Sequence, residues 1–567
     1  MIRKTRGRAL AAALLPLLLA ATAGAQEVPP SPAPSPEAAP RPGIPEATGQ
    51  APVLPSPANP RQDAPVLNLS LDEAVRRTLE NNVDIAVQRF DPEASDIAVD
   101  ELRGVYEPIL SSTVTQRSST APATNVFAGA AETETDTLNY NFGAFQQIPT
   151  GGQFRVDFTN RRTATNSVFE SFNPQYRSDF NLQFTQPVLR NLAVDSNRYQ
   201  IKVAKKNQDI SDVQFRQTVA NTVAGVKSAY YDLLYAIDNL EAQRKSLALA
   251  TRLLDENRIR VRVGTMAPLD VVAAESEQAS REEAVIVAEA AVAEAEDALK
   301  RAIFNDASDP AVWATRIVPT DRPTAEPASV DVEAATRTAL EKRTDMSAAR
   351  MGLDNAEYGI EFARNQLLPQ LDLVANYGTT GTGGTFFERE GFGGPVLRTV
   401  PGGYSDAVSD VFGFNYPTWS IGLNVSYPVL NRQARAARAR AQVRRDQSQA
   451  SLRRLEMQVT AEVRSAARAV ETNFKRVEST RAARVLAERR LDAETKRFAA
   501  GMSTNFLVTQ SQRDLALAEV AELRAVADYR KSQVNFERVQ EAGGGSVGGV
   551  TTISSSGRGG SGTTAIQ

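Results

Sequence analysis

Two long stretches without proline constrain this chain more than any other feature. Residues 188–263 contain no Pro and a single Gly, and residues 429–541 contain no Pro and only Gly501. Such runs favour helices, because Pro removes a backbone donor and Gly is a poor helix former. At 1.5 Å per residue, Ser196–Arg262 predicts a helical rod about 100 Å long. Its apolar residues follow the four-and-three steps of a coiled-coil seam, with Arg244, Thr251 and Arg258 at the intermediate positions: Leu233, Ile237, Leu240, Leu247, Leu254 and Val261.

The two long runs belong to a duplication that extends over most of the chain. Four short segments recur in the same order: LENNVD from Leu79 as LEKRTD from Leu340, PIL from Pro108 as PQL from Pro369, PVL from Pro187 as PVL from Pro428, and RVRVG from Arg260 as RFAAG from Arg497. Matches in one order indicate two copies of one unit. We expect a first repeat at 66–303 and a second at 330–541, each with a helix, strands and a long helical hairpin. A linker at 304–329 joins them.

The first 25 residues have the pattern of a secretory signal peptide. Four basic residues precede an apolar stretch at 9–23, and Ala23-Gly24-Ala25 supplies a cleavage pattern: the basic residues are Arg3, Lys4, Arg6 and Arg8. A short transmembrane anchor is the alternative, but the stretch is shorter than the roughly 20 residues that span a bilayer. We expect an exported bacterial-type protein.

Two further segments have compositions that cannot bury a core. Residues 26–65 are rich in Pro, and residues 542–567 are rich in Gly and Ser. Low hydrophobicity of this kind is typical of disordered chain, so the sequence predicts a disordered linker and a disordered tail.

Several segments between the helices alternate apolar and polar residues. Trp419, Ile421 and Leu423, for example, alternate with Ser420 and Gly422. This alternation is typical of lipid-facing barrel strands, and a half-buried soluble sheet shows it as well. We expect strands at about 110–116, 138–148, 153–163 and 179–186 in the first repeat, and at 371–374 and 419–427 in the second.

The signal peptide, the tandem repeats and the hairpins together resemble the TolC-like outer-membrane efflux protein family, over roughly residues 66–541. The resemblance implies a mixed α and β membrane protein: a homotrimer whose strands close a β-barrel in the outer membrane and whose helices continue as a periplasmic α-helical barrel. It implies a passive outer-membrane channel of a tripartite efflux or type I secretion system. Its partners would be a periplasmic adaptor protein, an inner-membrane pump and outer-membrane lipid.

The strand count departs from the family pattern, which has two strands per repeat and twelve in the trimer. The first repeat here offers four strands, with a short turn at Pro149-Thr150-Gly151-Gly152 and long connections elsewhere. Short periplasmic turns and long outer loops fit a bacterial barrel. Either the hairpin 138–163 enters a wider barrel, or it stands outside a standard one.

The two hairpin tips are the candidate functional sites. Each long helix breaks at a Gly, where the left-handed backbone that ends many helices is readily formed. One interpretation is that these glycines only turn the chain. The resemblance adds that the tips face the adaptor and ring the periplasmic entrance. The candidate docking residues are Val263, Gly264, Thr265, Gly501, Met502 and Ser503.

Acidic side chains just past the tips form a gate in the family. Asp270 matches this pattern in the first repeat, whereas Leu507 and Gln510 occupy the matching positions of the second. Asp270 and Gln510 are the candidate gate residues. Asp270 can equally be a first-turn acid that complements the helix dipole.

Composition excludes most enzymatic functions. The chain has no Cys and no His, and its net charge is −3. Thiolate nucleophiles, His bases and the usual metal ligands are therefore absent, and nothing indicates a nucleic-acid binder. We expect no enzyme, no cofactor and no metal site. The alternative to a channel is a periplasmic adaptor or a coiled-coil envelope scaffold. A channel's cargo could be a drug, a metal or a protein.

Overall fold

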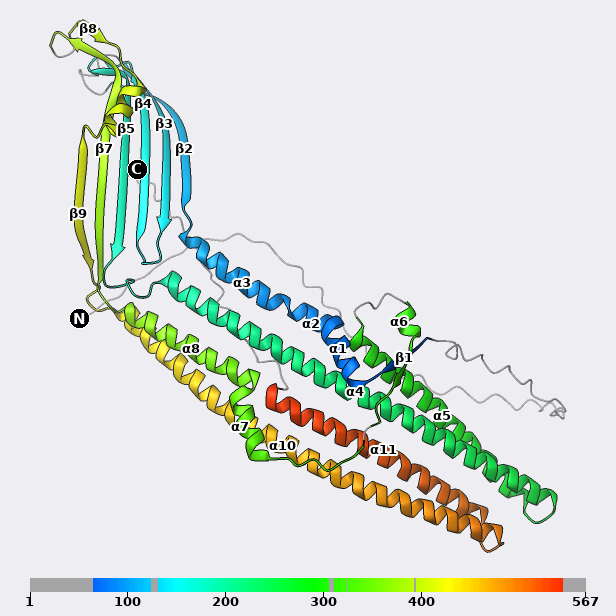
Figure 1. Cartoon of the computed structure of the whole chain (residues 1–567). Helices are drawn as coiled ribbons and strands as arrows, with labels where there is room; N and C mark the ends of the chain where they lie inside the picture. Colours follow the sequence, from blue (N-terminus) through cyan, green and yellow to red (C-terminus); the bar gives the residue numbers. More distant parts are fainter. Residues whose placement is uncertain (1–64, 124–130, 305–309, 323, 392–393, 544–567) are drawn as a thin grey trace, which may run out of the picture. The chain divides into compact units, whose positions relative to one another are not determined.

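Two antiparallel helical hairpins contain the longest helices of the structure. The computed structural model describes residues 65–123, 131–304, 310–322, 324–391 and 394–543 (Figure 1). Helix α4 (Ser196–Arg262) packs along α5 (Pro268–Ile303), and α10 (Arg432–Ala499) packs along α11 (Asn505–Glu541). The hairpins also contact each other through α4 and α11. The helix predicted at Ser196–Arg262 is confirmed at both ends, because no residue between them interrupts the backbone ladder.

Most of the shorter helices precede the strands of their repeat and pack on the hairpins. Ser70 caps the first of them, because its hydroxyl accepts a hydrogen bond from the Glu73 amide at 3.2 Å. The bounds are α1 Leu71–Asn81, α2 Val83–Gln88, α3 Phe90–Arg103 and the 3₁₀ turn η1 Gly104–Tyr106 in the first repeat, α6 Pro310–Ala314 between the repeats, and α7 Val332–Lys342, α8 Thr344–Asn365 and α9 Tyr404–Phe412 in the second.

The core of each hairpin lies at the coiled-coil seam. Leu233 and Leu254 of the predicted seam in α4 are fully buried, and so are Val459 and Val463 in α10. The other predicted seam residues of α4, such as Ile237, are only half-buried. Small residues occupy many of the remaining buried positions, for example Ala250. The helices therefore bury a narrow stripe and leave the rest of their surface exposed.

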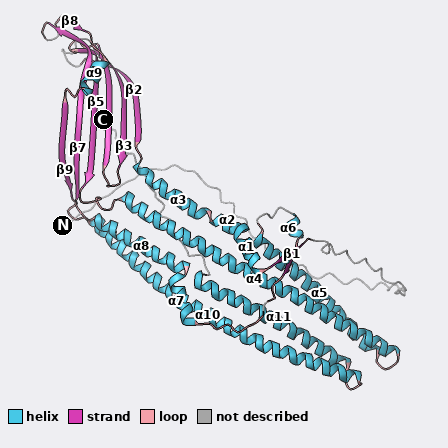
Figure 2. Cartoon of the chain, in the orientation of Figure 1, coloured by secondary structure: helices cyan, strands magenta, loops and turns pink. Residues whose placement is uncertain are grey.

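A seven-stranded sheet is built from strands of both repeats, which in each repeat lie between the shorter helices and the long hairpin in sequence (Figure 2). Its strands follow the order β2-β3-β4-β5-β7, with β8 and β9 both paired to β7, and every pair is antiparallel. The bounds are β2 Ile109–Pro122, β3 Glu132–Gln147, β4 Gln153–Thr165, β5 Phe172–Pro187, β7 Gln370–Arg389, β8 Val396–Val400 and β9 Pro417–Ser426.

Most strands extend further than the sequence predicted. Strand β7, predicted at 371–374, reaches Arg389, and β3 begins at Glu132, six residues before the predicted start. The alternation is weak in these extensions, because Thr and Gly replace the large apolar residues, while backbone pairing continues. One of the long connections expected in the first repeat, at 117–137, is therefore short. Residues 117–122 extend β2, residues 132–137 extend β3, and these two extensions pair with each other.

The extra hairpin of the first repeat is part of the sheet. Strand β3 pairs with β2 from Glu132 to Phe145, and β4 pairs with β5 from Gln153 to Thr163. The structure therefore contradicts the alternative in which residues 138–163 stand outside the sheet. Two strands are inserted between β2 and β5.

The sheet has one apolar and one polar face. A single row across it, read from one strand pair to the next, is apolar throughout: Leu110, Ala144, Val156, Leu182, Tyr377 and Trp419. Helix α9 packs on the same face, where the Thr379 hydroxyl donates to the Val411 carbonyl at 3.0 Å. Gly381 allows this approach, since a Cβ there would meet the Ala407 carbonyl oxygen at 1.9 Å.

Part of the predicted inter-repeat linker is ordered. Strand β6 (Arg316–Pro319) pairs in parallel with β1 (Val66–Leu69). Ile317 and Leu69 are fully buried together with Tyr230 of α4. This small sheet attaches the connection between the repeats to the first hairpin.

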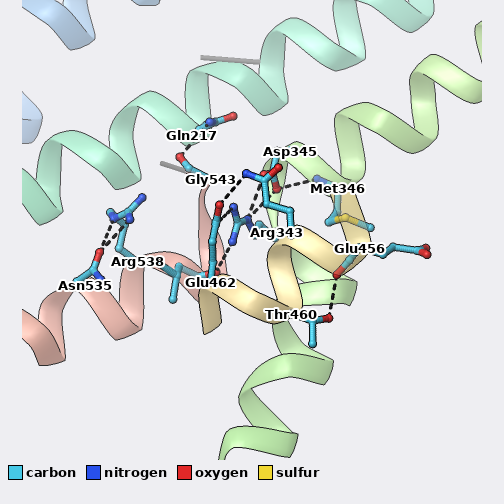
Figure 3. A network of polar contacts seen from close by, with 12 residues as sticks. Gln217, Arg343, Asp345, Met346, Glu456, Thr460, Glu462, Asn535, Arg538 and Gly543 are labelled. Atoms are coloured by element: carbon cyan, nitrogen blue, oxygen red, sulfur yellow. Dashed lines mark hydrogen bonds and ion pairs between the residues drawn. The ribbon is translucent and has the colours of Figure 1, made fainter. Parts of the chain in front are cut away.

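A cluster of buried charged side chains connects the α7–α8 junction of the second repeat to α10 and α11 (Figure 3). Arg343 lies between α7 and α8 with a 1% exposed side chain, and its guanidinium donates to the carboxylates of Asp345 and Glu462. Burial by itself would raise the pKa of Glu462, but hydrogen bonds from Gln458 and Arg343 outweigh it and lower that pKa. The Glu462 carboxylate therefore stays ionised beside Arg343.

The same cluster corrects the predicted start of the C-terminal tail. Ala542 is fully buried, and the Gly543 carbonyl accepts hydrogen bonds from the side-chain amides of Gln217 and Asn221, both at 3.2 Å. Composition places both residues in the tail, because Gly and Ser also dominate residues 544–549. The predicted signal peptide, the Pro-rich linker up to residue 64 and the tail from residue 544 lie outside the described residues.

Candidate functional site

Each hairpin tip is a Schellman turn centred on a glycine. Gly264 has φ +80°, its amide donates to the Val261 carbonyl at 3.0 Å, and the Thr265 amide donates to the Arg260 carbonyl at 2.9 Å. These two bonds satisfy carbonyls that the end of α4 would leave unpaired. The predicted turn position in the first repeat is confirmed.

The second tip repeats this geometry. Gly501 has φ +75°, its amide donates to the Phe498 carbonyl at 3.1 Å, and the Met502 amide donates to the Arg497 carbonyl at 2.9 Å. No heavy atom outside the turn lies within 4 Å of where a Cβ would stand on either glycine. Glycine is therefore favoured here by the backbone conformation and not by close packing.

The helices restart in different ways after the two turns. Helix α5 begins with Pro268 at its first position, whereas the Thr504 hydroxyl caps α11 by accepting from the Leu507 amide. Pro has no amide hydrogen to leave unpaired in a first turn, and Thr supplies an acceptor for one. The Ser503 hydroxyl donates to the Glu494 carboxylate, so this docking candidate also stabilises its own turn.

A contact that the sequence analysis missed ties the two tips together. The buried Asn257 side-chain amide donates to the Asn505 side-chain oxygen at 2.8 Å, and the Asn505 amide donates to the Asp270 backbone carbonyl at 3.3 Å. Arg260 adds a hydrogen bond to the Phe498 carbonyl, and its guanidinium lies 4.2 Å from the centre of the Phe498 ring. The only sign of this contact in the sequence was the presence of Asn257 and Asn505 among apolar residues of α4 and α11.

Large apolar side chains around the tips are exposed. Leu269 is 77% exposed and Phe506 is 70% exposed, although both belong to the first turn of a helix. We call the tip surface the set of exposed apolar residues Val263, Leu269, Met502, Phe506 and Leu507. Exposed apolar clusters of this kind are typical of interaction sites. Val263 and Met502 were predicted from the sequence, whereas Leu269 and Phe506 were not.

The two candidate gate residues, Asp270 and Gln510, make different contacts in the structure. Asp270 is half-buried near the start of α5, and its backbone carbonyl is the atom that contacts the second tip. Gln510 instead donates to Asp514, one turn further along α11, at 2.8 Å, and Asp514 also pairs with Arg490 at 3.0 Å. The acidic partner of Gln510 is therefore Asp514, which was not predicted from the sequence.

A buried ion pair joins the two repeats behind the tips. The Glu277 carboxylate of α5 accepts hydrogen bonds from Arg281 on the same helix and from Arg513 on α11. Burial by itself would raise the pKa of Glu277, but the two arginines outweigh it and hold that pKa below its ordinary value. The pair therefore remains charged near neutral pH and fixes α5 against α11.

Neither a metal cluster nor a membrane-crossing helix is found in the described ranges. They contain no group of three or more His, Cys, Asp or Glu side chains that could hold a metal ion. Across the same residues, no helix combines the length and the apolar character needed to cross a membrane.

Comparison with known proteins decides the family. The model of the family described as outer membrane efflux protein matches residues 74–303 and 335–539, more than half of the chain. The chain belongs to the outer membrane efflux protein family. The two matched segments lie within the two tandem repeats that the duplication predicted. The family resemblance derived from the sequence is therefore confirmed.

Individual relatives support this family assignment. The chain is 24% identical to the outer membrane protein TolC of Escherichia coli (strain K12) over 363 residues, which are 63% of this chain and 68% of that protein. It is 28% identical to the TolC of Vibrio cholerae over 177 residues, which are 31% of this chain and only 39% of that protein.

Solved structures share the fold of this efflux-family chain. A membrane protein from Pseudomonas aeruginosa is similar with a TM-score of 0.60 and 19% identity, covering 85% of this chain and 92% of that one. The outer membrane channel CmeC of Campylobacter jejuni has a TM-score of 0.57 and 16% identity, covering 83% and 85%. Family membership places the chain in the outer membrane, with an extension into the periplasm.

Proposed function

We propose that this efflux-family chain is the outer-membrane channel of a tripartite efflux or type I secretion system. In this proposal three copies close their sheets into one barrel and their helices into a periplasmic tunnel. The channel conducts cargo passively after a periplasmic adaptor and an inner-membrane pump deliver it. The chain performs no chemistry of its own.

One observation carries the proposal: strand β9 exposes large apolar side chains on one face of the sheet. Trp419 of β9 is 71% exposed, and Ile421 and Leu423 beside it are more than 60% exposed. Leaving such area in water is unfavourable by about 25 cal/mol per Å². The opposite face carries Ser420 and Asn424. Lipid on one face and water on the other is the environment that suits this alternation.

The hairpin tips support adaptor docking at the other end of the helices. The tip surface combines exposed apolar side chains with two turns whose glycines leave open space around them. Helices of a partner can approach a backbone closely where no side chain intervenes. We propose that the docking residues are Val263, Gly264, Thr265, Gly501, Met502 and Ser503, together with Leu269 and Phe506.

Acidic groups just behind the tips support a gate. We propose Asp270 and Gln510 as gate residues, with Gln510 acting through the Asp514 carboxylate that it contacts. A ring of carboxylates at a narrow entrance favours cations and is sensitive to their concentration. The rival function, a soluble adaptor or scaffold, gives no role to the exposed apolar row of β9.

Fractionation combined with deletion tests the proposed function. The gene is deleted from its host, and three readouts are compared with and without the restored gene: ethidium accumulation, sensitivity to Cu²⁺ and the set of secreted proteins. We expect the chain in the outer-membrane fraction and at least one readout to change and be restored. Recovery in the soluble periplasm, or no change in any of the three, would contradict the proposal.

A further inference from the structure

The sheet has two long free edges. Among the described strands, β2 pairs only with β3, and β9 pairs only with β7. Nearly every residue of β2 and every residue of β9 is exposed, whereas most residues of β3, β4 and β5 are half-buried. Free backbone donors and acceptors along such edges are a template for pairing with another chain, and lipid offers them no partner.

The direction of the strands allows one copy to continue the sheet of the next. Six long strands lie in the order β2-β3-β4-β5-β7-β9, and each pair is antiparallel. Because six is even, β2 and β9 run in opposite directions. The β9 edge of one copy therefore meets the β2 edge of a second copy in the antiparallel sense that every pair of this sheet uses.

The two edge strands also lie at matching heights, and their apolar side chains lie on the same face of the sheet. Strand β2 begins soon after the 3₁₀ turn that follows α3, and β9 ends shortly before α10 begins. Leu110 and Val114 of β2 lie on the same face as Trp419 and Leu423 of β9, as the strand registers show. Pairing the edges would make the apolar face continuous from one copy to the next.

We propose that β9 of one copy pairs with β2 of the next, and that three copies close a barrel of eighteen strands. This inference rests on the proposed trimeric channel and departs from the twelve strands that the family resemblance implies. At a strand spacing of about 4.8 Å and a tilt of about 40°, eighteen strands give a backbone diameter of about 36 Å, against about 24 Å for twelve. The two added strands per copy therefore widen the outer-membrane opening.

The polar face supports an open, water-filled interior. Arg155 pairs with Asp157 at 2.7 Å, and Arg177 pairs with Asp179 at 3.1 Å, all on the face opposite the apolar row. Helix α9 packs on the apolar face and so lies outside the barrel. Barrels of 16–18 strands leave an aqueous channel. Restriction of the cargo would then lie at the periplasmic tips and not at the membrane.

Engineered disulfides test the edge pairing, and the chain suits them because it contains no Cys. Leu423→Cys is combined in turn with Leu110→Cys, Ser112→Cys and Val114→Cys, so that several registers are sampled. We expect one combination to give disulfide-linked dimers and trimers on a denaturing gel. The matched control, Leu423→Cys with Val156→Cys of the interior strand β4, should give none, because β4 has both edges occupied.

Electron microscopy of the unmodified chain in lipid nanodiscs counts the strands directly. Eighteen strands in cross-section support the inference. A trimer with twelve strands would overturn the inference and leave the proposed channel standing. A disulfide bond between β2 and β5 in a Val114→Cys, Phe180→Cys variant would have the same meaning, because β3 and β4 would then lie outside the sheet. A monomer would overturn both the inference and the proposed trimeric channel.

Discussion

Asn82 and Arg343 occupy equivalent places in the two repeats, and each side chain donates to a carbonyl in the last turn of its own repeat's final helix. Asn82 donates to the Ala302 carbonyl of α5 at 3.0 Å, and Arg343 donates to the Val539 carbonyl of α11 at 3.2 Å. Both residues end the first helix of their repeat. The recurring sequence motif thus clamps the start of each repeat to its end.

The two clamps differ in chemistry. The Asn82 side chain is neutral and also caps α2 through the Ile85 amide. Arg343 is charged and therefore needs the carboxylates of Asp345 and Glu462 beside it. Isolated buried charges are strongly unfavourable, so the second clamp functions only as a group.

Replacing Arg343 with Met should destabilise the chain by about 3–5 kcal/mol, because it leaves the buried Asp345 carboxylate without its partner. The measurement is the thermal loss of helical circular dichroism. Arg337→Met, which removes an exposed arginine from the same helix α7, is the control and should change little. Equal stability of the two variants would show that the cluster is not a clamp.

The position of the C-terminal end can be tested by two truncations. Removing residues 544–567 should leave stability unchanged. Removing residues 542–567 should lower it by about 1–3 kcal/mol, since Ala542 is buried and the amides of Gln217 and Asn221 lose the Gly543 carbonyl as acceptor. Thermal unfolding of both truncations measures the difference. Identical midpoints would mean that the tail begins before Ala542.

Glu277 should make stability depend on pH in a defined direction. Its pKa in the folded chain lies below the ordinary value of 4.5, so its contribution is present above that value and is lost as the pH falls through the folded pKa. Glu277→Gln should therefore destabilise the chain by about 1 kcal/mol at neutral pH, a modest figure because Arg513 is half exposed. The difference from wild type should shrink as the pH falls below 4.5 and through the folded pKa.

The control for this pH series is Glu282→Gln, at an exposed position of the same helix. Its unfolding midpoint should follow that of the wild type at every pH. A Glu277→Gln difference that grew on acidification would contradict the assigned direction of the pKa shift.

Substitutions at the two tip glycines should distinguish a role in turn formation from a role in adaptor docking. Gly264→Asn keeps a small residue that tolerates positive φ, whereas Gly264→Arg adds a long charged side chain into open space. Both should cost only about 1 kcal/mol in stability. We expect export to survive the Asn variant and to fail with Arg, and the same for Gly501. The measurement is an export assay beside a trimer gel, and normal export with both Arg substitutions would show that the tips only turn the chain.

The sequence predicted the features that single residues determine. Gly264 and Gly501 mark both turns, and the long run without Pro marks the helix α4. Such signals are local, because each concerns one residue's backbone preference. The length of β7 was underestimated because pairing with β5 holds Gly-rich and Thr-rich segments that have little strand preference of their own.

Contacts between distant segments could not be predicted in the same way. Asn257 and Asn505 lie 248 residues apart, and nothing in either local pattern names the other. Leu269 and Phe506 were missed because an apolar residue in a first turn is usually buried, and here only the geometry of the tips exposes them. The inserted hairpin was visible as a pattern, but its place between β2 and β5 required the registers.

The central claim is that this chain forms a water-filled conduit through the outer membrane, and conductance across a planar lipid bilayer tests it most directly. The purified full chain is added to one side, and current is recorded at fixed voltage. The account predicts discrete upward steps of uniform size, each marking one inserted trimer. A bilayer that stays non-conducting while labelled trimers are shown to have inserted would contradict it.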